Sequence, residues 1–572
     1  MAPAATVRFT RYRVSTPSRD DSRINDARMT EITSSSLTAG ADAPSRSPRV
    51  TSHHPPPHPA PFLRPIVFLG GVTSVGIELA ASRLVAPYFG GSTFIWANLI
   101  GVTLAFLSLG YWLGGRIADR RPSPTLLYTV TALGAVAAAL VPIMSRPILR
   151  TSLHAFDRYD IGAFYASLIG VLLLLAVPIT LLGFVTPFAI RLRLRDVATA
   201  GHTAGNIYAL STIGSILGSF LPVIVLIPLV GTARTFLILS LLLLIPSILG
   251  LLIVRARSLA ATAALLAVAL PPLSLVAEAG VIRPPELGHL VYEHESEYNY
   301  IQVIEDQGRY LLALNEGHAI HSIYDPTQLL THGPWDYFMV APLVNPTAGP
   351  ASLKSALLIG LAGGTVARQL TAGYGPIPID GVELDPDVAR VGRQYFGLNA
   401  LPNLNILVED GRYFLRTTDR RYDLIGIDAY RQPYIPFQLT SKEFFQEVSD
   451  HLNPAGVAVV NAGRTATDFR LVNVIASTMR AVYAHVYVID VESYSNSIVV
   501  GTNAPGGIDA FKANIASFPT TSPVRLVAER SLASGNLREV PAGGTVFTDD
   551  HAPVEQVIDQ IILSAARAGA GP

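Results

Sequence analysis

A series of long apolar runs between residues 65 and 280 constrains this chain more than any other feature. Each run is close to the roughly 20 residues that a helix needs to cross about 30 Å of hydrocarbon. Half of the 572 residues are hydrophobic and only 15% are charged, which is unusual for a soluble chain. The runs predict a helical membrane domain of about seven spans, near residues 65–87, 93–115, 125–145, 162–190, 206–230, 233–254 and 258–278.

Two details inside these runs bear on the helices. The fourth run is long and contains Pro178 and Pro187, which predicts a kinked helix or a broken pair. The first run contains Glu78 and, five residues later, Arg83. Ionisable groups at such a depth are candidates for a function, and the alternative is a charge pair that only serves the structure.

Arginine clusters mark one side of the predicted membrane domain. They lie at Arg116, Arg120 and Arg121, at Arg191, Arg193 and Arg195, and at Arg255 and Arg257. Short loops rich in arginine stay in the cytoplasm, so these three loops and the N-terminal tail are expected there. Seven crossings then put everything after residue 280 outside the cytoplasm, and an even number puts it inside.

Composition bounds the remaining functions. Residues 1–62 are rich in Ser, Pro and Arg without apolar periodicity, so they are expected to form a disordered tail. The formal net charge is zero, so no basic field indicates a nucleic-acid partner. The chain has no cysteine, which excludes disulfides, thiolate metal sites and cysteine nucleophiles.

The pattern changes after the last apolar run, so residues 63–282 are expected to form the transmembrane domain and the remainder a folded α/β part. Residues 283–345 alternate polar and apolar residues with turn signals, which predicts a β-hairpin subdomain. Residues 346–572 alternate short strands and helices and predict a Rossmann-like, doubly wound α/β domain. Ligands of such sheets bind outside the carboxyl ends of the strands.

Four consecutive strand ends carry residues that suit a nucleoside. The first strand is followed by "IGLAGG", with Gly360, Gly363 and Gly364. Small residues there let a ligand approach the backbone. The second strand ends at Glu383, where an acidic side chain accepts hydrogen bonds from ribose hydroxyls. The third and fourth strands are followed by Asp410 and Asp428. Together these residues predict a nucleoside site with a carboxylate beside it.

At this point the sequence resembles the spermidine synthase family, the polyamine aminopropyltransferases. The resemblance runs from about residue 288 to residue 505, in the order of the family, through "YEHESEYNYIQV", "LNEGHAIHS", "PWDYFMVAPL", "LLIGLAGGTVARQL", "VELDPDVARVGRQYF", "VEDGRYFL", "YDLIGIDAYRQPYIPFQLTSKEFF" and "LNPAGVAVVN". The whole chain resembles the membrane-fused branch, in which a transporter-like helical half precedes the synthase half. "GYWLGGRIADRR", residues 110–121, is similar to a loop of major facilitator transporters.

The resemblance implies a role for each matching residue. Glu383 would bind the ribose of decarboxylated S-adenosylmethionine and Asp410 its adenine, while Asn299 stands where the family has a Gln facing the donor. Asp428 would be the base that deprotonates an amine acceptor such as putrescine, and no metal is implied. His321 falls among the positions that would contact the substrate.

Two departures from the family leave the substrates open. Gly363 stands where the glycine loop of the family has an Asp for the donor's amine, and Arg431 stands where an acidic residue helps to bind the polyamine. An arginine repels a diamine and suits a carboxylate, so the donor could be intact S-adenosylmethionine or the acceptor something other than putrescine.

Aromatic residues nevertheless offer a slot for a cation. Core packing is an alternative explanation for each of them. They are Trp335, Tyr337, Tyr430 and Tyr434.

The sequence therefore predicts a multi-pass cell-membrane transferase that acts on a small amine or another acceptor, with a homodimer among its expected assemblies. The alternatives are a methyltransferase on the same fold, which the departure at Gly363 favours, and a transporter whose synthase-like half senses a nucleoside. Because sulfonium nucleosides are cytosolic, the synthase half is expected in the cytoplasm, which requires an even number of crossings.

One further polar cluster lies near the C-terminus. Asp549, Asp550 and His551 could cap the active site or bind a cation, and the alternative is a turn that starts the last helix.

Overall fold

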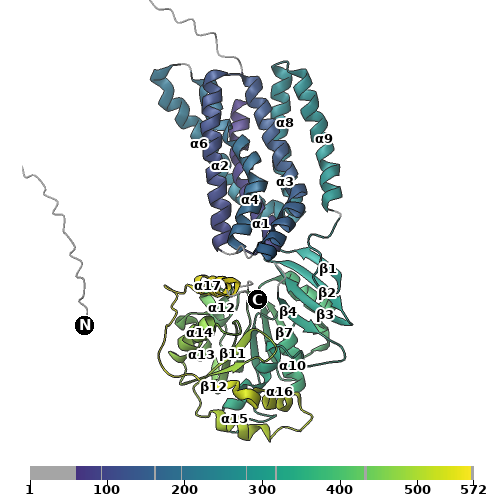
Figure 1. Ribbon diagram of the computed structural model, residues 1–572, viewed down its shortest axis with the longest axis vertical. Helices are drawn as coiled ribbons and strands as arrows, with labels where there is room; N and C mark the ends of the chain where they lie inside the picture. The colour runs from purple at the N-terminus through teal and green to yellow at the C-terminus, as the bar shows by residue number, and fades with distance from the viewer. Residues whose placement is uncertain are drawn as a thin grey trace, which may run out of the picture. The chain divides into compact units, whose positions relative to one another are not determined.

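The computed structural model describes residues 60–567, apart from residues 92, 160–162, 195, 279, 316–318 and 431–433 (Figure 1). All of these described residues belong to one unit, Pro57–Pro572. The predicted disordered tail, residues 1–62, lies almost entirely outside the described residues, as do Arg195 and Arg431.

The first half of the described chain is helical. Its elements are α1 (Leu63–Phe89), α2 (Thr93–Arg120), α3 (Pro124–Tyr159), α4 (Ala163–Gly183), α5 (Val185–Arg193), η1 (Val197–Thr199), α6 (Ala200–Phe220), η2 (Leu221–Leu226), α7 (Ile227–Val230), α8 (Thr232–Ile253) and α9 (Arg257–Glu278). In the described part of the chain, seven helical segments are long and apolar enough to cross a membrane. This number agrees with the sequence-based prediction. α4 and α5 together form one of the seven, Tyr165–Arg193, with a break at Phe184, as expected for a kinked fourth run.

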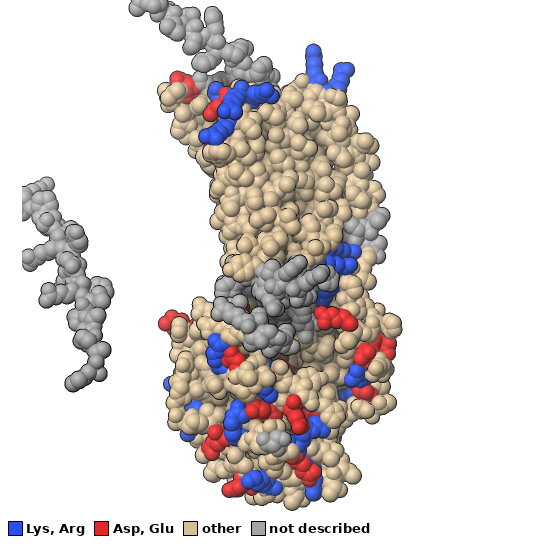
Figure 2. Space-filling view, viewed as in Figure 1, with Lys and Arg blue, Asp and Glu red and all other residues tan. Residues whose placement is uncertain are grey.

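Close backbone contacts hold these helices together. A Cβ atom on Gly214 of α6 would lie 2.0 Å from the backbone oxygen of Phe68 in α1, so only glycine permits this approach. Buried polar side chains pair across helices, as Thr131 does with Ser247 at 2.8 Å between oxygens. The side of the helical part visible in Figure 2 is almost free of charged residues, which gather toward its ends and on the following domain.

A small antiparallel sheet follows the helices. Its strands pair in the order β1-β2-β3-β4 and are β1 (His289–Glu295), β2 (Tyr300–Asp306), β3 (Arg309–Leu314) and β4 (Ile320–Tyr324). Apolar side chains of β2 and β3, among them Ile301 and Leu312, pack against Val388 and Val391 of helix α11 (Pro386–Tyr395). This contact fixes the turn between β1 and β2 beside the start of α11.

The last part of the chain is an eight-stranded sheet with helices. The helices and helical turns are η3 (Pro334–Val344), α10 (Thr365–Tyr374), α11, η4 (Leu398–Ala400), α12 (Gly411–Thr417), η5 (Phe437–Leu439), α13 (Lys442–Asp450), α14 (Arg470–Arg480), α15 (Ile508–Ile515), α16 (Pro523–Leu532), η6 (Ala533–Gly535) and α17 (Val554–Arg567). The strands are β5 (Ala356–Ile359), β6 (Ile379–Glu383), β7 (Leu404–Val408), β8 (Tyr422–Ile427), β9 (Leu452–Gly463), β10 (His485–Asp490), β11 (Asn496–Thr502) and β12 (Leu537–Glu539).

The strand order of this sheet is β12-β10-β11-β9-β8-β5-β6-β7. Strands β5 to β9 run parallel to their neighbours in this group, whereas β11 pairs antiparallel with β9 and β10. The Rossmann-like α/β fold predicted from the alternating pattern is therefore confirmed. Because β5 to β8 are parallel, their carboxyl ends meet at one edge of the sheet.

A buried arginine ties the C-terminal segment to this domain. The guanidinium of Arg412 donates to Glu447 at 2.9 Å and to Asp549 at 2.8 Å, and Ser441 also donates to Asp549. Burial lowers the pKa of Arg412, but the hydrogen bonds from both carboxylates outweigh it, so the pKa is raised. Asp549 thus serves an ion pair in the structure. It does not support the cation site considered from the sequence.

Loss of this arginine is expected to destabilise the C-terminal α/β domain. Arg412→Leu leaves Asp549 without its ion-pair partner and Glu447 with only the exposed Arg416. We expect a cost of about 2 kcal/mol or more, below the roughly 3 to 5 kcal/mol of a fully buried pair, because the Asp549 side chain is 42% exposed. Arg416→Leu is the matched control, since Arg416 also pairs with Glu447 but is exposed. Thermal unfolding of the purified chain measures the loss of stability in both variants. Equal losses in the two variants would contradict the assigned role of Arg412.

Candidate active site

The four predicted strand ends lie side by side. β5 pairs with both β6 and β8, and β6 pairs with β7, in every case in parallel register. The glycine turn follows β5, Glu383 ends β6, Asp410 lies two residues after β7 and Asp428 follows β8 directly. The structure therefore brings together the residues that the sequence places at strand ends.

The glycine turn makes close contacts on both sides. Gly360 has φ +86°, and a Cβ atom there would lie 2.5 Å from the backbone oxygen of Asp428. The turn can therefore lie directly beside the end of β8. The N–H of Gly363 donates to Ser322 Oγ of β4 at 2.8 Å. A Cβ atom at Gly363 would come within 2.8 Å of Ser322 and Phe396, so a carboxylate side chain has no room at this position.

Glu383 is held by the backbone. Its Oε2 accepts from the N–H of Ala362 at 2.8 Å, in the glycine turn, and its Oε1 accepts from the N–H of Asp385 at 3.1 Å. Burial raises the pKa of Glu383 to about 7, although these backbone hydrogen bonds oppose the shift. A ligand hydroxyl that donates to the charged form would lower this pKa again. Its role toward ribose stays a prediction.

Asp410 caps helix α12. Its Oδ1 accepts from the N–H groups of Arg412 at 3.0 Å and Tyr413 at 2.9 Å. This explains locally why an aspartate follows β7, since it satisfies two N–H groups at the helix start. Both of these hydrogen bonds use Oδ1. The predicted hydrogen bond between Asp410 and adenine would therefore use Oδ2.

Asn299 is engaged in a polar network. Its Nδ2 donates to Asp385 Oδ2 at 2.9 Å, and its Oδ1 accepts from Asn315 at 3.1 Å. Ser296 Oγ donates to the same carboxylate oxygen of Asp385. Asn299 thus acts on the start of α11 in this structure, and its predicted contact with a donor stays a prediction.

Asp428 lines a small cavity and is bound by two side chains. Asn461 Nδ2 of β9 donates to its Oδ1 at 3.0 Å, and Trp335 of η3 donates a second hydrogen bond. Burial raises the pKa of Asp428 to about 6, and these two hydrogen bonds oppose the shift. Asn496 Nδ2 donates to Asn461 Oδ1 at 2.9 Å, which fixes the orientation of the Asn461 amide. The carboxylate is therefore oriented, and a moderate change of environment alters its protonation near neutral pH.

The same cavity contains several predicted substrate contacts. Its wall includes His321, Trp335 and the glycine turn from Gly360 to Ala362. Trp335 also contacts Tyr494 edge-on, with ring centroids 6.5 Å apart.

The other predicted aromatic contacts lie in different settings. Tyr337 is only 1% exposed and packs in the hydrophobic core, away from the cavity lining. The hydroxyl of Tyr430 accepts from the N–H of Gly463 at 2.9 Å and donates to the backbone oxygen of Asn461 at 3.1 Å. Burial, and then the nearby Asp428, raise the pKa of Tyr430. Tyr434 donates to Asp559 at 2.6 Å, and Arg431 lies outside the described residues.

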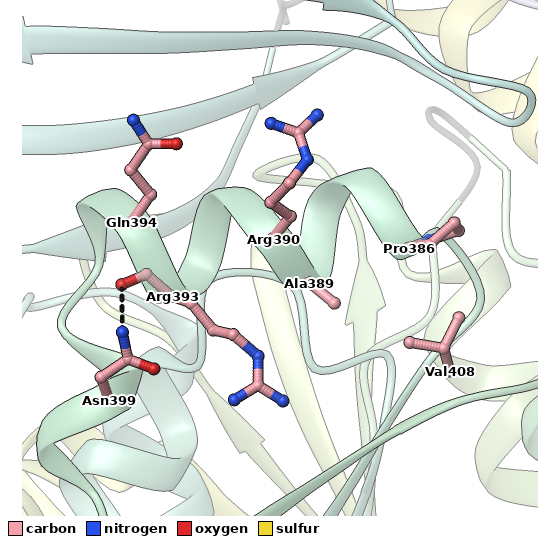
Figure 3. A pocket seen from close by; sticks show the side chains of 7 residues that line it. All are labelled: Pro386, Ala389, Arg390, Arg393, Gln394, Asn399 and Val408. Carbon is pink, nitrogen blue, oxygen red and sulfur yellow. Dashed lines mark hydrogen bonds between the residues drawn. The ribbon is translucent and has the colours of Figure 1, made fainter.

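A separate groove lies along helix α11 (Figure 3). It is lined by Pro386, Ala389, Arg390, Arg393, Gln394, Asn399 and Val408. Asn399 donates to the backbone oxygen of Arg393 at 3.3 Å, and Arg390 donates to Asp387 at 2.6 Å. None of the predicted site residues lines this groove, although Val408 is the last residue of β7.

Sequence reasoning missed several residues of the site. Asn461, which orients Asp428, is the last residue of the segment "LNPAGVAVVN" at the end of an apolar strand. A polar residue at the carboxyl end of a buried parallel strand was the available signal. Ser322 and Asp385 gave weaker signals, because their partners Gly363 and Ser296 are far away in the sequence.

The part of the chain that contains this site matches a known protein family. Residues 340–505 match the family model of the spermine/spermidine synthase domain. The chain carries a spermine/spermidine synthase domain. This domain includes the glycine turn, Glu383, Asp410 and Asp428, and it confirms the resemblance noted from the sequence.

Relatives extend the match beyond that domain. The chain is 31% identical over 297 residues to a probable polyamine aminopropyl transferase of Bifidobacterium longum, covering 49% of this chain and 65% of the relative. It is 27% identical over 430 residues to the polyamine aminopropyltransferase of Corynebacterium efficiens, covering 71% of this chain and 77% of the relative. This second alignment is longer than the synthase half, so it reaches into the helical half. The chain spans just under two thirds of the length of the Bifidobacterium relative.

Part of this chain is similar to a solved structure. A probable spermidine synthase from Corynebacterium glutamicum is 21% identical, with a TM-score of 0.37, and covers 45% of this chain and 96% of that protein. Among the described residues, no group of three or more His, Asp or Glu side chains is arranged to hold a metal ion.

The raised pKa of Glu383 predicts how nucleoside binding depends on pH. If ribose binds the charged carboxylate, a pKa of about 7 leaves only about a tenth of the sites competent at pH 6. Methylthioadenosine should then bind about tenfold more weakly at pH 6 than at pH 8 in calorimetry.

Two variants test the origin of this dependence. Glu383→Gln should bind weakly at both pH values and lose the dependence, because the amide does not titrate. Asp428→Asn, which removes the second carboxyl of the candidate site with a raised pKa, should keep the dependence. A dependence that persists in Glu383→Gln would exclude Glu383 as its source.

Proposed function

We propose that this chain is a membrane-embedded, spermidine-synthase-like transferase. It moves the aminopropyl group of decarboxylated S-adenosylmethionine to an amine such as putrescine. The observation that carries the proposal is the strand-end edge, where Glu383 and the glycine turn lie beside Asp428 and its cavity. The spermine/spermidine synthase domain and the relatives named as polyamine aminopropyltransferases support it.

The chemistry needs little beyond position and one proton acceptor. An ammonium acceptor loses a proton to Asp428, and its free nitrogen attacks the propyl carbon bonded to the sulfonium. The new C–N bond forms as the C–S bond breaks. The electron pair of that bond stays on sulfur, so methylthioadenosine leaves as a neutral thioether. Since a sulfonium is a good leaving group, Asp428 and the donor-binding residues mainly orient and deprotonate.

Gly363 supports one competing reaction. The space beside it is filled by Ser322 and Phe396, so the loop cannot present a carboxylate there to a donor amine. A donor that retains its own carboxylate would not need that contact. Intact S-adenosylmethionine, with methyl transfer in place of aminopropyl transfer, is therefore the second candidate.

Turnover of the purified chain tests both reactions. With decarboxylated S-adenosylmethionine and a pool of amines, mass spectrometry is expected to show an aminopropyl product. Asp428→Asn should reduce turnover by about 100-fold or more while methylthioadenosine affinity changes little. Methylated products made only from intact S-adenosylmethionine would establish the second candidate instead.

The bilayer placement of the helical half is also part of this proposal. The arginine-bearing loops follow the second, fourth and sixth candidate spans, and the synthase half follows the seventh. The sequence-based cytoplasmic placement requires an even number of crossings, and seven of the described helical segments are long and apolar enough to be candidates for a crossing. Seven spans and the positive-inside rule together support a synthase half on the side opposite to the arginine loops.

A pair of reporter fusions tests this orientation. A reporter that works only in the cytoplasm should be silent when it is fused to the C-terminus. The same reporter should be active when the chain is cut and fused after Arg121, in the first arginine loop. Activity of the C-terminal fusion would place the active site in the cytoplasm and leave one candidate span that does not cross.

A further inference from the structure

The turn between β1 and β2 is held from the side of the synthase site by Asp385. Ser296 is 4% exposed, and its hydroxyl donates to the Asp385 carboxylate. Asn299, three residues later, donates to the same oxygen at 2.9 Å. Asp385 is completely buried and receives these bonds at the start of α11, where it also accepts from the N–H of Asp387 at 2.9 Å.

Asp385 in turn acts on the predicted donor site. Its own N–H donates to Glu383 Oε1 at 3.1 Å. A shift of Asp385 therefore moves one of the backbone donors that orient the Glu383 carboxylate. Hydrogen-bonding geometry is sensitive to such shifts, because hydrogen bonds weaken steeply with misalignment.

Helix α1 holds the same turn from the other side. The guanidinium of Arg83 donates to the backbone oxygen of Glu297 at 2.9 Å and to that of Ser296. Glu295 precedes this turn. Burial raises its pKa, and the positive charge of Arg83 is the largest influence that lowers it. The planar fork of an arginine suits two neighbouring carbonyl oxygens.

We propose that Arg83 of the helical half is a positioning residue for the donor site of the synthase half. It fixes the backbone of Ser296 and Glu297, so that Ser296 and Asn299 can fix Asp385 and, through it, Glu383. The inference rests on the proposed binding of the donor nucleoside by Glu383. It gives the ionisable residue predicted inside the first apolar run a task in nucleoside binding, in place of a charge pair with Glu78.

Arg150 of α3 offers a matched control. It also donates to two backbone oxygens, those of Val281 at 3.2 Å and Ile282 at 3.0 Å, in the segment that leads into β1. These bonds reach the same part of the chain, but no recorded hydrogen bond connects them with Asp385. Arg83→Gln and Arg150→Gln therefore remove similar contacts, and only the first should affect the donor site.

Calorimetry with methylthioadenosine on the full-length purified chain tests the proposal. We expect Arg83→Gln to weaken binding about three- to tenfold, Arg83→Lys to restore part of it, and Arg150→Gln to leave it unchanged. In turnover, Arg83→Gln should raise the KM of the sulfonium donor while kcat at saturating donor changes little. Ser296→Ala, which keeps the Arg83 contacts but cuts the bond to Asp385, should give the same loss. The double variant should add nothing to it.

Three results would overturn the proposal. Equal losses in Arg83→Gln and Arg150→Gln would mean general loosening of the chain. Unchanged affinity in Arg83→Gln and Ser296→Ala, together with a loss in Glu383→Ala, would refute the role of Arg83 while the donor site stands. Unchanged affinity in Glu383→Ala would refute the donor site itself, and the role of Arg83 with it.

Discussion

The parallel register of β7, β6, β5 and β8 is the constraint on which the site depends. Parallel strands end at one edge, so four segments spread over about seventy residues present their carboxyl ends together. The close approach of the glycine turn to the end of β8 depends on the same register, since Gly360 lies against the backbone of Asp428. A strand between β5 and β8 would separate the nucleoside side from the carboxylate that is proposed as the base.

Glu383 and Asp428, the two carboxyl groups of the candidate active site with a raised pKa, are oriented by different groups. Burial raises the pKa of both. Backbone N–H groups orient Glu383, and those groups belong to the glycine turn and the start of α11. Side chains orient Asp428, through the amide of Asn461 and the indole of Trp335. A backbone-bound carboxylate is suited to stay in place and accept from a ligand. A side-chain-bound carboxylate beside a cavity is suited to exchange a proton with an amine.

The helical half follows other physical rules. Its helices approach closely through glycines such as Gly214, and their outward surface is apolar. Charged residues are rare in such helices. Arg83 of α1 is one of them, and its guanidinium bonds the β1–β2 turn at Ser296 and Glu297. That connection is a physical link between the helical half and the proposed donor site.

The sequence by itself determined the seven apolar helices, the change to an α/β domain and the residues at the strand ends. Each of these follows from local pattern, since a helix of some twenty apolar residues, a strand followed by glycines and an acid after a strand are all visible within a short window. It also drew attention to Asp549 and to Arg83, for which it considered a cation site and a charge pair with Glu78. Tertiary structure alone showed that Asp549 pairs with Arg412, that Asn461 orients Asp428 and that Arg83 reaches Ser296. These contacts join residues from about thirty to more than two hundred positions apart, and no local pattern encodes them, because a hydrogen bond depends on where folding places both partners.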